Sequence, residues 1–127
     1  DTIKIAGKRT GPAEVEAVLL GTGLVKDAAV IGVPDELTGS ALICVCVLSG
    51  EGPRNVEQDL IKAVGERLGK SYRPKRVMFV SDLPRTRNQK IMRRVVRSIL
   101  TGTPVGDLSS LANPESLGEI RQLAAGG

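Results

Sequence analysis

The chain has 127 residues, a formal net charge of +4 and an apolar content of 41%, which together indicate one soluble globular domain and exclude a pair of domains. It contains no histidine, so a histidine general base, a Ser-His-Asp triad and a histidine metal site are excluded within it. With one tyrosine, one phenylalanine and no tryptophan, it lacks the aromatic platforms on which single-strand nucleic-acid binders stack bases.

The first ten residues predict a short hairpin with Gly7 at its turn, because the alternation of residues 3–5 is broken at residues 6–8 before Arg9 and Thr10 follow. A helix is then expected from about Pro12, since proline suits the first helical turn, where the acidic Glu14 and Glu16 complement the helix dipole. Gly21 or Gly23 is expected to end this helix, because glycine readily adopts the left-handed conformation of a C-terminal cap.

Two strands are predicted next, over 24–33 and 41–48. The second is an uninterrupted apolar run, which is typical of a central strand that is covered on both faces. Cys44 and Cys46 should point to the same face of this strand, two positions apart. With no other cysteine or histidine to complete a metal site, we interpret them as small buried residues of a protein from a reducing cytosol.

The second half of the chain alternates helices and strands. The expected elements are a helix over 55–68 with Asn55 as N-cap and Gly69 after its end, a strand over 76–80, a loop over 82–89, a helix over 90–100, a linker over 101–106 and a terminal helix over 114–125. The order β-β-α-β-β-α-β-α predicts an α+β fold, in which helices pack on a small sheet made of the N-terminal hairpin and about three central strands.

The segment from Val80 to Arg97 is the strongest local signal for function. A strand end runs into a proline-containing loop that presents Lys90 at the start of an amphipathic helix. Between Pro84 and Leu100 there is no acidic residue, and the cationic residues are Arg85, Arg87, Lys90, Arg93, Arg94 and Arg97. This pattern predicts an anionic ligand, and together with a pI of about 9.4 it also permits a small basic nucleic-acid-binding module.

Two ordered motifs carry a resemblance to a known family. Residues 1–16, DTIKIAGKRTGPAEVE, are similar to the first motif of the C-terminal domain of adenylate-forming enzymes, the family of acyl-CoA synthetases, nonribosomal adenylation domains and luciferases. Residues 83–94, LPRTRNQKIMRR, resemble the last motif of that family, and residues 30–35 with Gly39 also match its pattern. The segment 106–114, GDLSSLANP, is similar to the tail of acetyl-CoA synthetases and their short-chain relatives.

The resemblance implies an AMP-forming acyl-CoA synthetase. Its substrates would be a small carboxylic acid, ATP and CoA, and Mg²⁺ would accompany ATP in an N-terminal domain that this chain does not contain. Lys90 would be the catalytic lysine of adenylation, where its charge lies between two anionic reactants. Ala6 and Gly7 would line the tunnel for CoA, and Arg9 would lie near its phosphates.

The resemblance also implies partners and a division of the chain. Residues 1–127 would form one mobile domain, with a core over 1–101 and a C-terminal extension over 102–127. It would rotate against the larger N-terminal domain about a hinge at or before Asp1, and it would be inactive alone.

The same resemblance also implies how Lys90 could be regulated and which acceptor the enzyme could use. A lysine acetyltransferase and a deacetylase could switch Lys90, although Gln89 stands where the family has a glycine. An adenylating domain with a carrier protein as acceptor is the alternative within the same fold.

No apolar run approaches transmembrane length, and the first residue, Asp1, suggests a piece excised from a longer protein. We therefore expect a cytoplasmic protein with no membrane or nucleic-acid partner.

Overall fold

The structure is a computed structural model that describes all residues except 1–2, 6–7, 11, 36–38, 51–54 and 127. Its elements are β1 (Ile3–Ile5), β2 (Lys8–Thr10), α1 (Pro12–Gly21), β3 (Val25–Asp35), β4 (Gly39–Leu48), α2 (Val56–Leu68), a 3₁₀ turn (Lys70–Tyr72), β5 (Arg76–Phe79), α3 (Arg93–Thr101), a second 3₁₀ turn (Pro114–Ser116) and α4 (Leu117–Gly126). This order confirms the predicted α+β fold.

The central sheet has the strand order β3-β4-β5. β3 and β4 are antiparallel, whereas β5 runs parallel to β4. The middle position of β4 confirms the prediction made from its uninterrupted apolar run. β1 and β2 pair with each other in a separate antiparallel ribbon, and β1 contacts β4.

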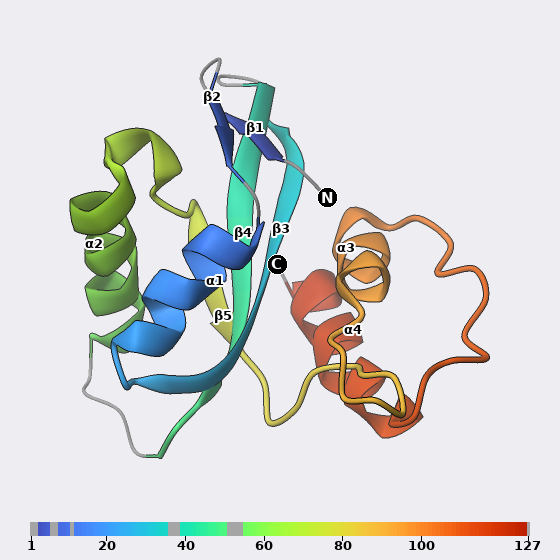
Figure 1. Ribbon diagram of the computed structural model, residues 1–127. Coiled ribbons are helices and arrows are strands. Elements are labelled where there is room, and N and C mark those ends of the chain that lie inside the picture. The colour runs from blue at the N-terminus through green and yellow to red at the C-terminus, as the bar shows by residue number, and fades with distance from the viewer. Residues whose placement is uncertain (1–2, 6–7, 11, 36–38, 51–54, 127) are drawn as a thin grey trace.

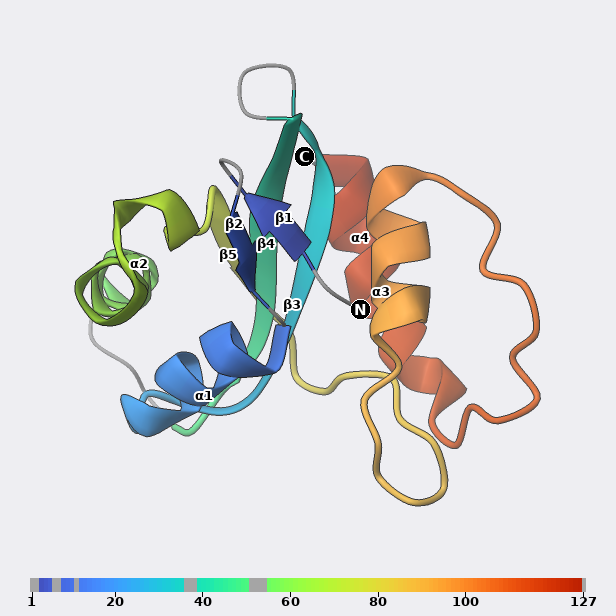
Figure 2. The same cartoon turned by 45° about the horizontal axis from the view of Figure 1, so that its top comes forward.

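Helices cover both faces of the central sheet. α1 and α2 contact each other on one side, and α3 and α4 contact each other on the other side (Figures 1 and 2). In the described part of the chain, no helix is both long and apolar enough to cross a membrane. Ile120 of α4 is fully buried in the core beneath α3, so the segment predicted as an extension contributes to the packing of the sheet.

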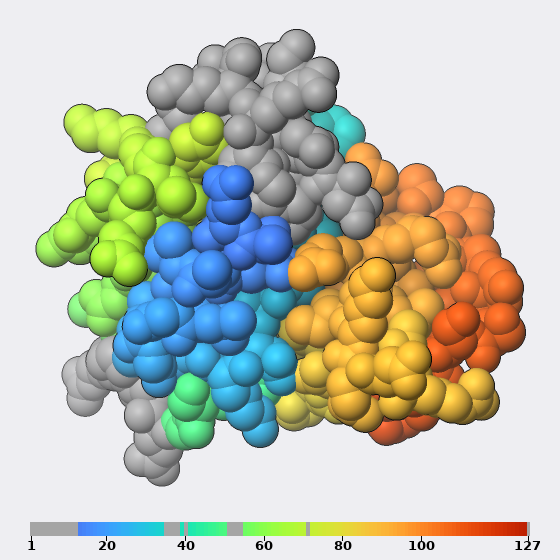
Figure 3. Space-filling model, in the orientation of Figure 1, coloured from blue at the N-terminus to red at the C-terminus, as the bar shows by residue number. Residues whose placement is uncertain are grey.

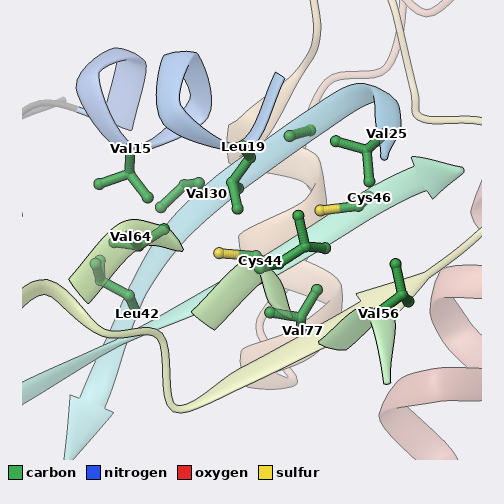
Figure 4. Packing of buried hydrophobic residues seen from close by; sticks show 12 residues of the cluster. Val15, Leu19, Val25, Val30, Leu42, Cys44, Cys46, Val56, Val64 and Val77 are labelled. Atoms are coloured by element: carbon green, nitrogen blue, oxygen red, sulfur yellow. The ribbon is translucent and has the colours of Figure 1, made fainter. Parts of the chain in front are cut away.

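The alternation of side chains along β4 builds two apolar cores, one on each face. Leu42, Cys44 and Cys46 belong to the core under α1 and α2, and Figure 4 shows both sulfur atoms among the aliphatic side chains of this core. Ile43, Val45 and Val47 belong to the core under α3 and α4. Both cysteines therefore lie on the same face and are buried, as predicted.

Burial changes the acid–base behaviour of these two thiols. It raises the pKa of Cys46 to about 12, with a smaller contribution from the charge of Glu16. It also raises the pKa of Cys44 well above its ordinary value, with help from Cys46 and Glu16. Both groups therefore stay protonated in the folded chain at physiological pH.

Alkaline pH is expected to destabilise the fold through these thiols. The unfolded thiols ionise near pH ~8.5, whereas the folded ones stay protonated, so stability that is complete below that pH falls as the pH rises further. Each thiol should contribute a slope of about 1.4 kcal/mol per pH unit there. Urea unfolding at pH 8 and pH 10 should show a smaller loss for a Cys44→Ala/Cys46→Ala variant than for the wild type, and equal losses would contradict the prediction.

Two predicted helix starts and one predicted cap differ from the structure. α3 begins at Arg93 and not at Lys90, because the backbone of residues 90–92 pairs with the preceding loop. The predicted terminal helix starts as a 3₁₀ turn at Pro114 and becomes α-helical only at Leu117. Asn55 precedes α2 as predicted, but its side chain forms no capping hydrogen bond.

Candidate functional site

Residues 84–92 form a small hairpin, here called the lysine hairpin, between β5 and α3. The backbone N–H of Thr86 donates to the carbonyl oxygen of Lys90 at 2.9 Å, and the N–H of Met92 donates to that of Pro84 at 2.8 Å. The N–H of Lys90 also donates to Oγ1 of Thr86 at 3.2 Å. Figure 2 shows this segment, in yellow to orange, projecting from the body of the molecule.

The turn of the lysine hairpin places Gln89 in the left-handed region. The N–H of Gln89 donates to the carbonyl of Thr86 at 2.9 Å, and the φ of Gln89 is 68°, the only positive φ outside glycine among the described residues. This bonding is the pattern of a three-residue hairpin loop that ends in a bulge, where glycine is preferred. The fold therefore favours a glycine at this position, where this chain has Gln89.

Replacing Gln89 by glycine is expected to raise the free energy of unfolding by about 1 kcal/mol, because it removes the cost of a left-handed residue with a Cβ atom. Urea unfolding of the chain measures this change. Gln89→Ala is the matched control, since it shortens the side chain but keeps the Cβ atom, and it should give no gain. A glycine variant less stable than the wild type would contradict the prediction.

The six cations of this region fall into two groups. Lys90 and Arg87 are exposed at the end of the lysine hairpin, and their side chains form no hydrogen bond or ion pair within the described part of the chain. The other four guanidinium groups are held by protein oxygen atoms: Arg85 by Asp27 and Asp82, Arg93 by Glu16, Arg94 by the carbonyls of Val105 and Asp107, and Arg97 by the carbonyl of Gly32.

Arg85 and Asp82 fix the base of the lysine hairpin to the sheet. Arg85 forms an ion pair with Asp27 of β3 and a second with Asp82, whose Oδ1 lies 3.3 Å from Nε of Arg85. Burial opposes the ionisation of Asp82, but hydrogen bonds from the N–H of Leu83, from Asn113 and from Arg85 outweigh it and lower its pKa. The carboxylate is therefore ionised at neutral pH and holds this base together.

Glu16 joins the start of α3 to α1 and β3. Its carboxylate accepts hydrogen bonds from Nε of Arg93 at 2.6 Å and from the backbone N–H of Val30 at 2.9 Å. The hydrogen bond to Glu16 raises the pKa of Arg93. The sequence predicted for Glu16 only an interaction with the helix dipole, and this ion pair was not predicted, although Glu16 directly follows the buried Val15. Figure 3 shows α1, in blue, beside the orange segment that begins α3.

The other predicted site residues lie elsewhere. Ala6 and Gly7 are outside the described residues. Arg9 lies on β2, paired in register with Lys4 of β1. Figure 1 shows β1 and β2 at the top, against the upper end of β4, whereas the lysine hairpin lies lower in the view, below α3. The fold therefore does not bring Arg9 and Lys90 together.

The structure is thus that of a small α+β domain with a hydrogen-bonded hairpin. This hairpin presents Lys90, whose side chain has no partner among the described residues. The sequence model of the family described as "AMP-binding enzyme C-terminal domain" matches residues 14–90, which is more than half of the chain. The chain belongs to this family. The matched region ends at Lys90.

Curated relatives narrow the resemblance to acetyl-CoA synthetases. The acetyl-coenzyme A synthetase of Methanothrix thermoacetophila is 45% identical over 123 residues, which cover 94% of this chain and 18% of the relative. Acetyl-coenzyme A synthetase 1 of Candida albicans is 38% identical over 130 residues, which cover 97% of this chain and 19% of the relative. The chain therefore spans about a fifth of the length of the curated relatives it matches.

Solved structures agree with this family. The acyl-CoA synthetase of Brucella canis matches with a TM-score of 0.67 and 35% identity, covering 73% of this chain and 18% of that one. MatB of Rhodopseudomonas palustris matches with a TM-score of 0.69 and 31% identity, covering 77% of this chain and 19% of that one.

Proposed function

We propose that this chain works as the mobile C-terminal domain of an AMP-forming synthetase that joins a small carboxylic acid, such as acetate, to CoA. The observation that carries the proposal is Lys90: an exposed ammonium group with no side-chain partner among the described residues, at the end of a hydrogen-bonded hairpin. A charge that the fold does not use is available for a ligand. Its neighbours Arg85 and Arg93 are held by carboxylates, which argues against a continuous basic surface for nucleic acid.

Lys90 would act in the first half-reaction. A carboxylate oxygen bonds to the α-phosphorus of ATP while the bond from that phosphorus to the pyrophosphate oxygen breaks. Both reactants are anionic, so a fixed ammonium between them lowers the barrier. The described residues contain no group of three or more Asp, Glu, Cys or His that could hold a metal ion, so the Mg²⁺ that accompanies ATP would be held by the N-terminal domain.

The opposite end of the domain would serve the second half-reaction. There the thiol of CoA attacks the acyl carbon and AMP leaves. Ala6 and Gly7 would line the passage for the pantetheine arm, and Arg9 would contact a phosphate of CoA. The separation of β1 and β2 from the lysine hairpin supports a rotation of the domain between the two steps (Figure 1).

The test uses the complete synthetase that carries this chain, supplied with acetate, ATP and Mg²⁺. Addition of CoA should yield acetyl-CoA, AMP and pyrophosphate, whereas the 127-residue chain alone should form none of them. Transfer to a phosphopantetheine-bearing carrier protein in place of CoA would change the proposed acceptor. Absence of acyl-adenylate with every short-chain acid tested would contradict the proposed function.

Acetylation of Lys90 is the regulation that we propose for this site. The side chain is exposed, so a lysine acetyltransferase could reach it, and acetylation removes the charge that adenylation needs. Mass spectrometry of the protein isolated from cells should find an acetyl group on Lys90 together with low adenylation activity. Acetylated protein with full adenylation activity would contradict this proposal.

A further inference from the structure

The segment after α3, residues 105–113, here called the tail segment, returns to the base of the lysine hairpin. Both ribbon views show this orange connection leaving α3 and coming back towards the start of α4 (Figures 1 and 2). Thr86 and Leu111 form an antiparallel bridge, and the N–H of Ala112 donates to the carbonyl of Arg85 at 2.8 Å. The tail segment thus pairs with the outer side of the hairpin's first strand.

The side chain of Asn113 completes this contact. Its Oδ1 accepts a hydrogen bond from the N–H of Arg85 at 2.8 Å, and its Nδ2 donates to Oδ2 of Asp82 at 3.0 Å and to the carbonyl of Leu83 at 2.8 Å. One amide therefore bonds to three residues on the two sides of Pro84, where the chain enters the lysine hairpin. A carboxylate or a hydroxyl at this position could not provide the same set of one acceptor and two donors.

The other parts of the C-terminal region are anchored as well. Arg94 of α3 donates to the carbonyl of Val105 and, at 2.9 Å, to that of Asp107. The carboxylate of Glu119 on α4 accepts a hydrogen bond from the N–H of Ser81 at 3.1 Å. The tail segment is therefore held at its start by Arg94 of α3 and at its end by the segment that leads into the lysine hairpin.

We infer that the tail segment fixes the lysine hairpin for adenylation, and that Asn113 is a positioning residue for Lys90. Because the side chain of Lys90 has no partner in the described structure, only the hairpin backbone places its charge. A two-stranded hairpin alone is marginally stable, so the pairing with the tail segment supplies the missing support. A displacement of about 1 Å at a reacting group can cost about a hundredfold in rate.

The tail segment lies beyond the residues that the family match covers, and the inference rests on the proposed function. The acetyl-coenzyme A synthetase of Methanothrix soehngenii aligns over 97% of this chain, so its alignment includes the tail segment. The structures of the wider family cover less of the chain, 73% for that of Brucella canis. The tail segment is therefore part of what this chain shares with that relative.

The test compares Asn113→Ala with the wild type in the complete synthetase. Pyrophosphate exchange with saturating acid and ATP measures adenylation, and thioester formation from preformed acyl-adenylate and CoA measures the second step. Asn113→Ala should lower adenylation about tenfold or more, with an unchanged KM for ATP and thioester formation within about twofold of wild type. Backbone amides of residues 84–92 should also exchange with deuterium faster.

Ser110→Ala is the matched control, because Ser110 is an exposed residue of the same tail segment. It should change neither half-reaction. If Asn113→Ala does not fold, Asn113→Asp keeps the acceptor for Arg85 but faces the carboxylate of Asp82, and it should show the same selective loss.

Equal losses in both half-reactions, or adenylation at the wild-type level, would overturn the inference. Lys90→Ala separates this failure from that of the proposed function. If Lys90→Ala abolishes adenylation and the Asn113 variants do not, only the positioning role is wrong. If Lys90→Ala adenylates normally, the adenylation role proposed for Lys90 fails, and the inference fails with it.

Discussion

Replacing Lys90 by alanine in the complete synthetase is expected to lower acyl-adenylate formation by about a hundredfold or more, the size of loss seen when a preorganised charge contact is removed. Thioester formation from preformed acyl-adenylate should stay close to that of the wild type, because the lysine hairpin would not face the reactants in that step. Pyrophosphate exchange and single-turnover thioester formation measure the two steps separately.

The Lys90→Ala variant tests the chemistry of the site and not the folding of the chain. Lys90 is exposed and its side chain has no partner among the described residues, so its loss removes no contact that stabilises the hairpin. The hairpin is held by backbone bonds of Thr86 and Met92 and by the tail segment, none of which uses the lysine ammonium. The melting temperature of the variant should therefore match that of the wild type.

Arg87→Ala is the matched control for net charge. Arg87 lies on the same hairpin and is also exposed without a side-chain partner in the described structure. If general attraction of anions explained the effect, both variants would lose activity to a similar degree. Lys90→Arg tests the shape of the charge, because a planar guanidinium does not replace a compact ammonium at a confined site.

Normal pyrophosphate exchange with a collapse of thioester formation in Lys90→Ala would assign Lys90 to the opposite step.

Local signals in the sequence predicted most of the fold. The uninterrupted apolar run of β4 predicted its central position, and the glycines after α1 and α2 predicted where those helices end. The start of α3 was predicted three residues too early, because residues 90–92 look helical in pattern but pair with the other side of the lysine hairpin. Helical periodicity predicts which face of a segment is apolar, but it does not predict whether the backbone of that segment pairs with another one instead.

The support of the site could not be predicted because it depends on partners far apart in the chain. Asn113 bonds to Arg85, 28 positions earlier, and Arg93 bonds to Glu16, 77 positions earlier. Apart from the family resemblance that singles out Lys90, the six cations look equivalent in the sequence. Only the fold separates four arginines that protein oxygen atoms hold from the two side chains, of Arg87 and Lys90, that remain available.

Glu16→Ala is expected to lower the free energy of unfolding by about 3 kcal/mol, because it leaves the partly buried guanidinium of Arg93 uncompensated and a buried N–H without its acceptor. Glu16 is only 6% exposed. Its loss would leave the guanidinium of Arg93 and the backbone N–H of Val30 without their acceptor. Urea unfolding of the chain at neutral pH measures the change.

Two further variants separate the causes of this loss. Glu16→Gln keeps one oxygen as acceptor but removes the charge, so it should cost less than Glu16→Ala. Glu16→Leu combined with Arg93→Met replaces the pair by apolar groups of similar size, and such replacements are often neutral or stabilising. The double variant should therefore be more stable than Glu16→Ala. A Glu16→Ala variant within about 1 kcal/mol of the wild type, the scale of an exposed ion pair, would show that this pair does not hold α3 against α1.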